Sequence, residues 1–97
     1  MMKDTFLENG WKMSDEDMMW YAAKAGLTYK EYTAYKETLK NQAKEAMRDL
    51  KGMFVGADAL YEDTIINSVG EKFLVLFRRF EMIESCGVIG GRKVYAI

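Results

Sequence analysis

The C-terminal stretch 68–97 constrains the fold of this 97-residue chain more than any other part of the sequence. Large apolar residues recur in it at the spacing of an amphipathic helix, and we expect that helix to span 69–85. Ser68 and Glu71 have the spacing of a capping box, in which each side chain satisfies a free backbone donor at a helix start. Gly87 suits the end of this helix, because glycine accepts a positive φ without steric cost. The residues predicted to face the core are Phe73, Leu76, Phe77, Phe80 and Ile83.

A tight β-hairpin is predicted directly after this helix. Gly90 and Gly91 lie between two short runs, 88–89 and 93–95, that suit strands. A two-glycine turn matches the right-handed twist of paired strands. The order helix, strand, turn, strand therefore anchors our interpretation of the fold.

Two further helices are expected upstream. Ser14 is a suitable N-cap, three acidic residues follow it in the first turn, and Gly26 ends this helix. Thr28 and Glu31 form a second capping box, which opens a long helix that ends at Gly52. Apolar residues at helical spacing give each helix a predicted buried side. These are Met18, Met19, Ala22 and Ala25 in the first, and Tyr32, Tyr35, Leu39, Ala43, Met47 and Leu50 in the second.

The segments between these elements are less regular. The apolar run 53–55 is flanked by glycines and predicts a brief strand. Residues 57–66 are then predicted to form a short helix, with Leu60, Tyr61 and Ile65 facing inward.

Near the N-terminus, residues 4–13 fit two structures. Asn9 and Gly10 make a strong hairpin turn that would pair Phe6 with Met13, whereas Gly10 could also end a short helix. We favour the helix, because an isolated hairpin is marginally stable without a sheet to join.

The composition excludes several kinds of site. The chain has one cysteine, Cys86, and no histidine, so neither an internal disulfide nor a Cys/His zinc site can form. We expect Cys86 to be a small buried side chain. Because the sequence has no catalytic histidine, nucleophile motif or phosphate-binding loop, we expect a protein that is not an enzyme and uses no cofactor or metal. The longest apolar block, 73–77, is too short to span a bilayer, which predicts a soluble, cytoplasmic protein without a membrane partner.

From Thr28 onward, the predicted order of elements resembles the winged helix-turn-helix family. The segment FRRFEMIESCGVIGGRKVYAI in particular is similar to the end of such domains, with an amphipathic helix, a glycine, two apolar residues, a turn and a closing strand. The resemblance implies an α+β fold, mostly α and winged-helix-like, with three to four helices, a short strand and a C-terminal β-hairpin. Residues 1–97 would form one domain, in which 1–27 is a helical extension of the core 28–97. The corresponding parts would be 29–51, 53–55, 57–66, 69–85 and 88–96.

A second resemblance competes for the binding surface. The segment 18–36, MMWYAAKAGLTYKEYTAYK, is similar to a plain helix-turn-helix, with the small Ala22 and with Gly26 at the turn. The simpler interpretation is two helices joined by a capped turn. We favour it, because the second helix is much longer than a recognition helix.

The winged-helix resemblance makes the helix 69–85 a recognition helix, and its outer face and the hairpin carry the candidate binding residues. They are Lys72, Val75, Arg78, Arg79 and Met82 on the helix, and Arg92 and Lys93 on the hairpin. Basic residues on such a face would contact phosphates, whereas Val75 and Met82 between arginines are typical of a protein interface. The alternative is an ordinary helix surface on which Arg78 and Arg79 pair with neighbouring glutamates.

The charge balance leaves the partner open between DNA and protein. The chain has 14 basic and 15 acidic residues and a net charge of −1, whereas a nucleic-acid binder usually has a basic excess. We hold two hypotheses. The first is a small winged-helix protein that binds duplex DNA, as transcriptional regulators of bacteria or mobile elements do. The second is a non-enzymatic protein-protein interaction module, such as a phage-type inhibitor or adaptor. A homodimer is compatible with both.

Overall fold

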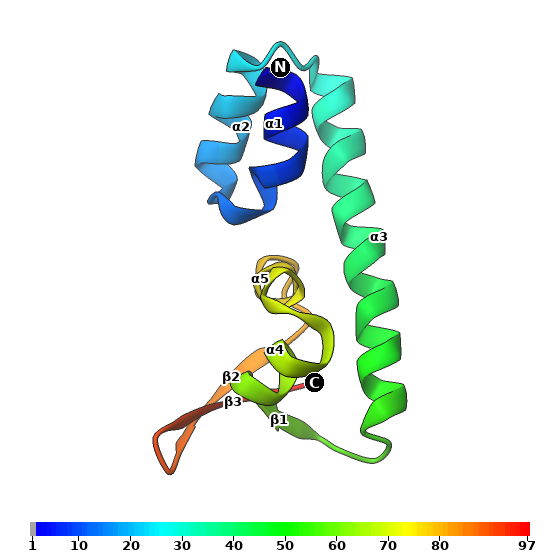
Figure 1. The fold of residues 1–97 in the computed structure, drawn as a ribbon, viewed down its shortest axis with the longest axis vertical. Helices are drawn as coiled ribbons and strands as arrows, with labels where there is room; N and C mark the ends of the chain where they lie inside the picture. The colour runs from blue at the N-terminus through cyan, green and yellow to red at the C-terminus, as the bar shows by residue number, and fades with distance from the viewer. Residues whose placement is uncertain (1) are drawn as a thin grey trace. The chain divides into compact units, whose positions relative to one another are not determined.

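The computed structural model describes residues 2–97, and within that range it contains five α-helices, one 3-10 helix and three strands (Figure 1). The predicted fold class, α+β and mostly α with a C-terminal hairpin, is confirmed. The resemblance implied three to four helices, and the most N-terminal helix brings the number to five. None of the described helices is long and apolar enough to cross a bilayer. In chain order the elements are α1 (Met2–Asn9), η1 (Gly10–Lys12), α2 (Asp15–Lys24), α3 (Tyr29–Met53), β1 (Ala59–Tyr61), α4 (Glu62–Val69), α5 (Glu71–Arg79), β2 (Glu84–Ile89) and β3 (Arg92–Ala96).

The chain divides into two compact units, Met1–Asn41 and Gln42–Ile97. The division falls inside α3, whereas the winged-helix resemblance placed a junction after residue 27. The reason is that α3 contributes buried residues to both units. Tyr32 and Leu39 belong to the first, and Ala43, Ala46, Met47 and Leu50 belong to the second.

Capping side chains fix the helix starts of the first unit as predicted. Ser14 Oγ accepts a hydrogen bond from the Asp17 amide at 3.2 Å, at the start of α2. Thr28 and Glu31 exchange both bonds of the capping box, each 3.1 Å long, at the start of α3. Lys3 also donates to the Glu31 carboxylate, and this contact lowers the pKa of Glu31.

Residues 4–13 belong to α1 and η1, so the favoured helical alternative is confirmed. Gly10 does not have the positive φ of a helix stop. It is buried, and a Cβ added there would lie 2.9 Å from Tyr35 Oη of α3. The Tyr35 hydroxyl donates to the Leu7 carbonyl at 2.9 Å, and its ring centroid lies 5.3 Å from that of Phe6. Gly10 therefore allows α3 to pack closely against the N-terminal helix.

The three strands of the second unit form one antiparallel sheet in the order β1-β3-β2. Ile89 pairs with Arg92 across the turn, and Gly90 and Gly91 have φ values of 59° and 80°. The predicted two-glycine hairpin is therefore confirmed.

The first strand lies later in the chain than predicted. Residues 53–55 do not form a strand, because α3 continues into them and a turn follows. β1 forms instead where Leu60 is buried and pairs with Tyr95 of β3. The predicted helix over 57–66 therefore begins later, as α4.

The predicted helix over 69–85 is also revised. Ser68 does not cap it, because this residue lies in α4 and its hydroxyl donates to the Thr64 carbonyl at 2.7 Å. Gly70, with a φ of 99°, separates α4 from α5. α5 ends well before residue 85, and Gly87 lies inside β2.

α5 ends in a Schellman motif that lacks the usual glycine. The Met82 amide donates to the Phe77 carbonyl at 2.8 Å and the Glu81 amide to the Arg78 carbonyl at 3.2 Å, which are the two bonds of that motif. Glu81 occupies the left-handed position with a φ of 55°. α2 ends in the same motif with Gly26 in that position, at a φ of 88°. Without a glycine to mark the end of α5, the predicted helix ran past it.

Candidate nucleic-acid interface

A helix pair and the hairpin build the candidate interface in the second unit (Figure 1). Gly70 alone joins α4 to α5, and its positive φ is readily available to glycine. One side of α5 is fixed in the core by Leu74, Leu76 and Phe77. Leu74 was not predicted to be buried, and Phe73, which was, is only half-buried. This packing determines which α5 side chains face outward.

Among the predicted binding residues of α5, Arg78 is the exposed one. Lys72, Val75 and Arg79 are half-buried, as is Met82 in the turn after the helix. Val75 and Met82 therefore do not form the open apolar surface that the sequence suggested between the arginines.

Arg78 of α5 and Lys93 of β3 line one hollow of about 330 Å³. Both side chains are exposed. Ser85 of β2, which the sequence did not single out, adds a hydroxyl to the same hollow. A guanidinium, an ammonium and a hydroxyl are the donors that commonly contact phosphate oxygens. The rest of the lining consists of Ile83, Gly87, Val88 and Tyr95.

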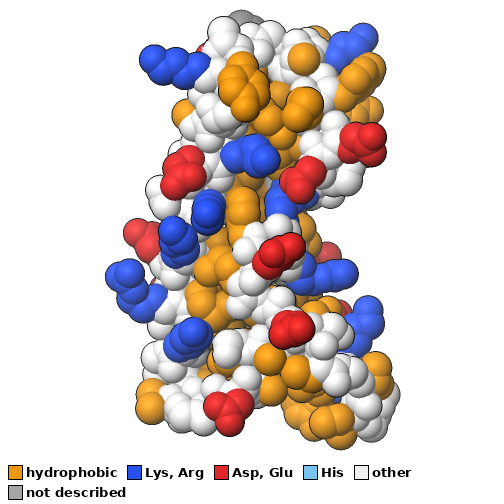
Figure 2. Space-filling view, turned by 180° about the vertical axis from the view of Figure 1, so that it is seen from behind, with side chains coloured by type: hydrophobic (Ala, Val, Ile, Leu, Met, Phe, Trp, Pro, Cys, Tyr) orange, Lys and Arg blue, Asp and Glu red, His pale blue; other side chains and the backbone are white. Residues whose placement is uncertain are grey.

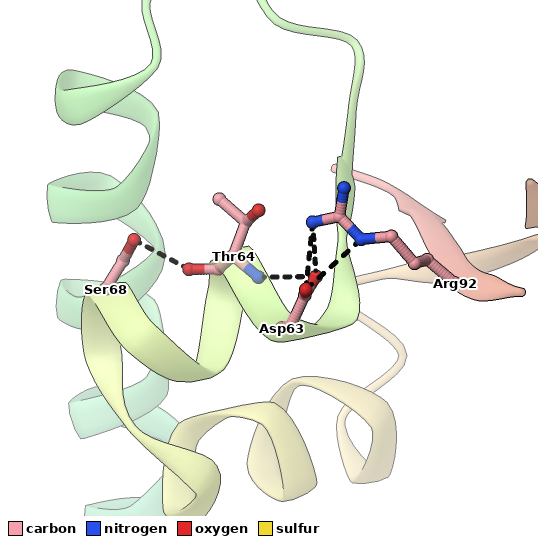
Figure 3. Close-up of polar contacts among 4 residues, drawn as sticks. All are labelled: Asp63, Thr64, Ser68 and Arg92. Carbon is pink, nitrogen blue, oxygen red and sulfur yellow. Dashed lines mark hydrogen bonds and ion pairs between the residues drawn. The ribbon is translucent and has the colours of Figure 1, made fainter. Parts of the chain in front are cut away.

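Arg92 is engaged elsewhere, because the carboxylate of Asp63 in α4 holds it (Figure 3). Arg92 Nη2 lies 2.8 Å from Asp63 Oδ1, and Nε lies 3.2 Å from Oδ2. The guanidinium also lies 3.7 Å from the centroid of the Tyr61 ring. Its hydrogen bonds lower the pKa of Asp63, and the carboxylate raises the pKa of Arg92. Arg92, which the sequence predicted to contact a partner, thus links the hairpin to the start of α4.

A second contact reinforces this link. The Tyr95 hydroxyl of β3 donates to Glu62 Oε2 of α4 at 2.9 Å. Burial, together with the neighbouring carboxylate, raises the pKa of the Tyr95 hydroxyl. Both contacts join the first turn of α4 to β3, so the hairpin strand that carries Lys93 is held in a defined place.

Acidic side chains limit the positive potential of this end of the chain. Glu71 at the start of α5, Glu81 in its terminal turn and Glu84 in β2 are all exposed. Arg92 is paired with Asp63, so Arg78 and Lys93 are the cations that line the hollow described above. Lys93 also borders a second hollow, which contains Glu62 and Asp63. The interface therefore has a small basic centre with acidic surroundings.

The row of basic residues along α3 is also mixed with acids. Lys40, Lys44 and Arg48 are exposed. The exposed acids Glu37, Glu45 and Asp49 directly follow Lys36, Lys44 and Arg48 in the sequence. Figure 2 shows acidic and basic side chains interspersed along the side of the molecule where α3 runs. This pattern is that of a solvated helix surface.

Cys86 is exposed in β2, so the prediction that it is buried is wrong. The reason is that it lies in an edge strand of the sheet and not at the end of an apolar helix. Within residues 2–97, no group of three His, Cys, Asp or Glu side chains could hold a metal ion.

Comparison with protein-family models, with curated proteins and with solved structures finds no match to this chain. The winged-helix resemblance therefore rests on the order of the elements alone.

Proposed function

We propose that this protein binds duplex DNA through α5 and the β2–β3 hairpin, as a small winged-helix protein of the kind that regulates transcription. The observation that carries the proposal is that Arg78 of the helix and Lys93 of the hairpin line the same hollow. A recognition helix and an adjacent wing would each supply one of these cations.

The arrangement of the second unit supports the same proposal. From α3 onward the elements run helix, strand, helix, helix, strand, strand, and β3 lies between β1 and β2 in the sheet. The chain order of these elements matches the order that the winged-helix resemblance implied, although the first strand lies later than predicted. The major groove of B-DNA is about 12 Å wide and admits an α-helix. α5 would enter it, with Arg78 reaching a phosphate or a guanine and Lys93 reaching the backbone.

The small number of available cations predicts weak, salt-sensitive binding. Each neutralised phosphate contributes about −0.9 to the slope of log affinity against log salt concentration. With Arg78 and Lys93 as the two contacts, we expect a slope of about −2 for each DNA-bound chain. Glu71 and Glu81 would oppose a close approach of the two ends of α5 to the phosphates.

The test is a salt titration of binding to a random-sequence duplex, followed by fluorescence anisotropy. The double variant Arg78→Glu/Lys93→Glu should abolish binding at low salt while the far-UV circular dichroism stays unchanged. The matched control, Lys40→Glu/Lys44→Glu, makes the same charge change on the exposed surface of α3 and should retain most of the affinity. No binding of the folded wild type at low salt, or equal losses in both double variants, would refute the proposal.

A second candidate function, a protein-protein interaction module, is favoured by one observation on the hairpin. Val88 and Ile89 of the edge strand β2 are 63% and 61% exposed, next to the glycine turn. Exposed apolar residues on an edge strand suit addition of a strand from a protein partner. Such a module would act without DNA. If the folded wild type does not bind DNA at low salt, that result favours the interaction module over the first proposal. Val88→Ser/Ile89→Ser should then abolish partner binding and leave the fold intact.

A further inference from the structure

α2, in the first unit, exposes three consecutive large apolar side chains on its outward side. Met19, Trp20 and Tyr21 are 59%, 55% and 46% exposed, although Met19 was predicted to be buried. Met18 and Ala22, at 0% and 1%, hold the opposite side of the helix in the core. The exposed residues line one broad depression together with Glu16, Asp17 and Ala23. Tryptophan, tyrosine and methionine are enriched in protein interfaces, so this face suits association.

The charges on α2 are separated along the helix. Asp15, Glu16 and Asp17 form its first turn, and Lys24 lies in its last turn. Lys24 Nζ lies 4.8 Å from the centroid of the Trp20 ring, which places the ammonium on the same exposed face. Glu16, Trp20 and Lys24 follow one another at intervals of four, so they form a single stripe on the helix surface.

This stripe is complementary to a copy of itself. When two α2 helices run antiparallel across a two-fold axis at Trp20, Glu16 of each helix faces Lys24 of the other. A two-fold interface uses the same patch on both chains, and it forms each contact twice. The antiparallel arrangement also places the acidic first turn of one helix beside the basic last turn of the other. Ala23, a small residue on the same face, lets the two helices approach closely.

We propose that this face of α2 is a dimerisation surface and that its partner is a second copy of this chain. Trp20 lies at the centre of the interface, and two intermolecular Glu16–Lys24 ion pairs flank it. Tyr29 extends the surface, because it is 77% exposed and lines a depression next to Met19. The charge pattern favours a second copy as the partner. Glu16 and Lys24 lie four residues on either side of Trp20, so the two charges of one helix match those of an identical antiparallel helix.

The size of the surface predicts a weak dimer. α2 has ten residues, and a pair of such short helices falls below the roughly 1,200 Å² that stable complexes bury. A dissociation constant in the micromolar range is therefore expected, and the monomer–dimer equilibrium should shift within an accessible range of protein concentrations.

The experiment is sedimentation equilibrium of the full chain without DNA, in a reducing buffer of low ionic strength. The wild type should show a monomer–dimer equilibrium. Glu16→Lys places like charges opposite each other at both ion pairs, and so does Lys24→Glu. Each single variant should raise the dissociation constant by roughly tenfold. Trp20→Ala should raise it by more, roughly thirtyfold, because it removes the central aromatic contact.

A mixture of the two charge variants gives the sharpest result. The lysine that Glu16→Lys introduces on one chain would face the glutamate that Lys24→Glu introduces on the other. The native Lys24 of the first chain and the native Glu16 of the second would form the remaining pair. An equimolar mixture of the two variants should therefore form heterodimers with nearly the wild-type affinity. A variant that had merely lost its fold could not be rescued in this way.

Lys44→Glu on α3 is the matched control, because it makes the same charge change on an exposed surface outside α2. It should dimerise like the wild type. A wild type that is monomeric at every concentration, or a mixture that associates no better than its components, would overturn the proposal. Because DNA is absent from the assay, these outcomes are independent of DNA binding.

Discussion

Replacing Glu81 with glycine should stabilise the protein, because a residue with a Cβ now holds a backbone conformation that favours glycine. Glu81 has a φ of 55° in the Schellman motif that ends α5. The same motif at the end of α2 has Gly26 in this position. The Glu81 side chain is exposed, so its removal takes no buried packing from the core.

The expected gain follows from two opposing effects. A left-handed conformation costs a residue with a Cβ about 1–2 kcal/mol, and glycine avoids that cost. Glycine also gives the unfolded chain more freedom, which lowers the free energy of unfolding by about 0.4–1 kcal/mol. The midpoints of these two ranges give a net increase in the free energy of unfolding of about 0.8 kcal/mol. For a chain of this length, the melting temperature should rise by about 2–6 °C.

Urea and thermal unfolding followed by far-UV circular dichroism would measure this change. Glu81→Ala is the first control, because it removes the charge and keeps the Cβ, and it should give no gain. Gly26→Ala is the second, because it adds a Cβ to the equivalent position with no atom within 4 Å. It should destabilise the protein by a similar amount. If Glu81→Gly gave no stabilisation, or if Glu81→Ala stabilised equally, backbone strain would be the wrong explanation.

Substitutions at three further positions test contacts elsewhere. Asp63→Asn should destabilise the protein at neutral pH, and its difference from the wild type should disappear in acid. The pKa of Asp63 is lowered from its ordinary value of 3.8 by the contact with Arg92, so the stabilisation is lost progressively as the pH falls from 3.8 through the folded-state pKa. A difference that does not shrink as the pH falls below 3.8 would contradict this reasoning. Gly10→Ala should cost about 1–3 kcal/mol in urea unfolding, because its Cβ would lie 2.9 Å from Tyr35 Oη; an unchanged midpoint would show that α3 can move away freely. Thr28→Ala should cost about 1 kcal/mol by removing half of the capping box, whereas Thr28→Ser should cost much less; equal losses would show that the hydroxyl is not responsible.

The features that could be predicted from the sequence are those that depend on nearby residues. The Ser14 cap and the Thr28 capping box each join residues three positions apart. The hairpin depends on Gly90 and Gly91, which supply the two positive φ values of its turn. In each case the side chain or glycine that specifies the structure lies within the element that it specifies.

The features that the sequence did not reveal depend on distant partners. β1 is a strand because Leu60 pairs with Tyr95 of β3, and no local pattern distinguishes that run from a helix. Arg92 looked available for DNA, but its partner Asp63 lies 29 residues earlier. In the candidate interface, Arg78 and Lys93 were both identified, whereas their common hollow follows from the packing of α5 against the hairpin.

The exposed thiol of Cys86 has a practical consequence for the study of this chain. It is the one cysteine of the sequence, and it lies in β2 between Ser85 and Gly87, two residues that line the Arg78–Lys93 hollow. Air oxidation can therefore join two chains covalently at the hairpin, far along the sequence from α2, and a reductant is needed whenever self-association is measured. The same thiol accepts a single maleimide fluorophore without any mutation. Cys86 itself is not among the lining residues of the hollow, so the label would mark the hairpin strand beside it.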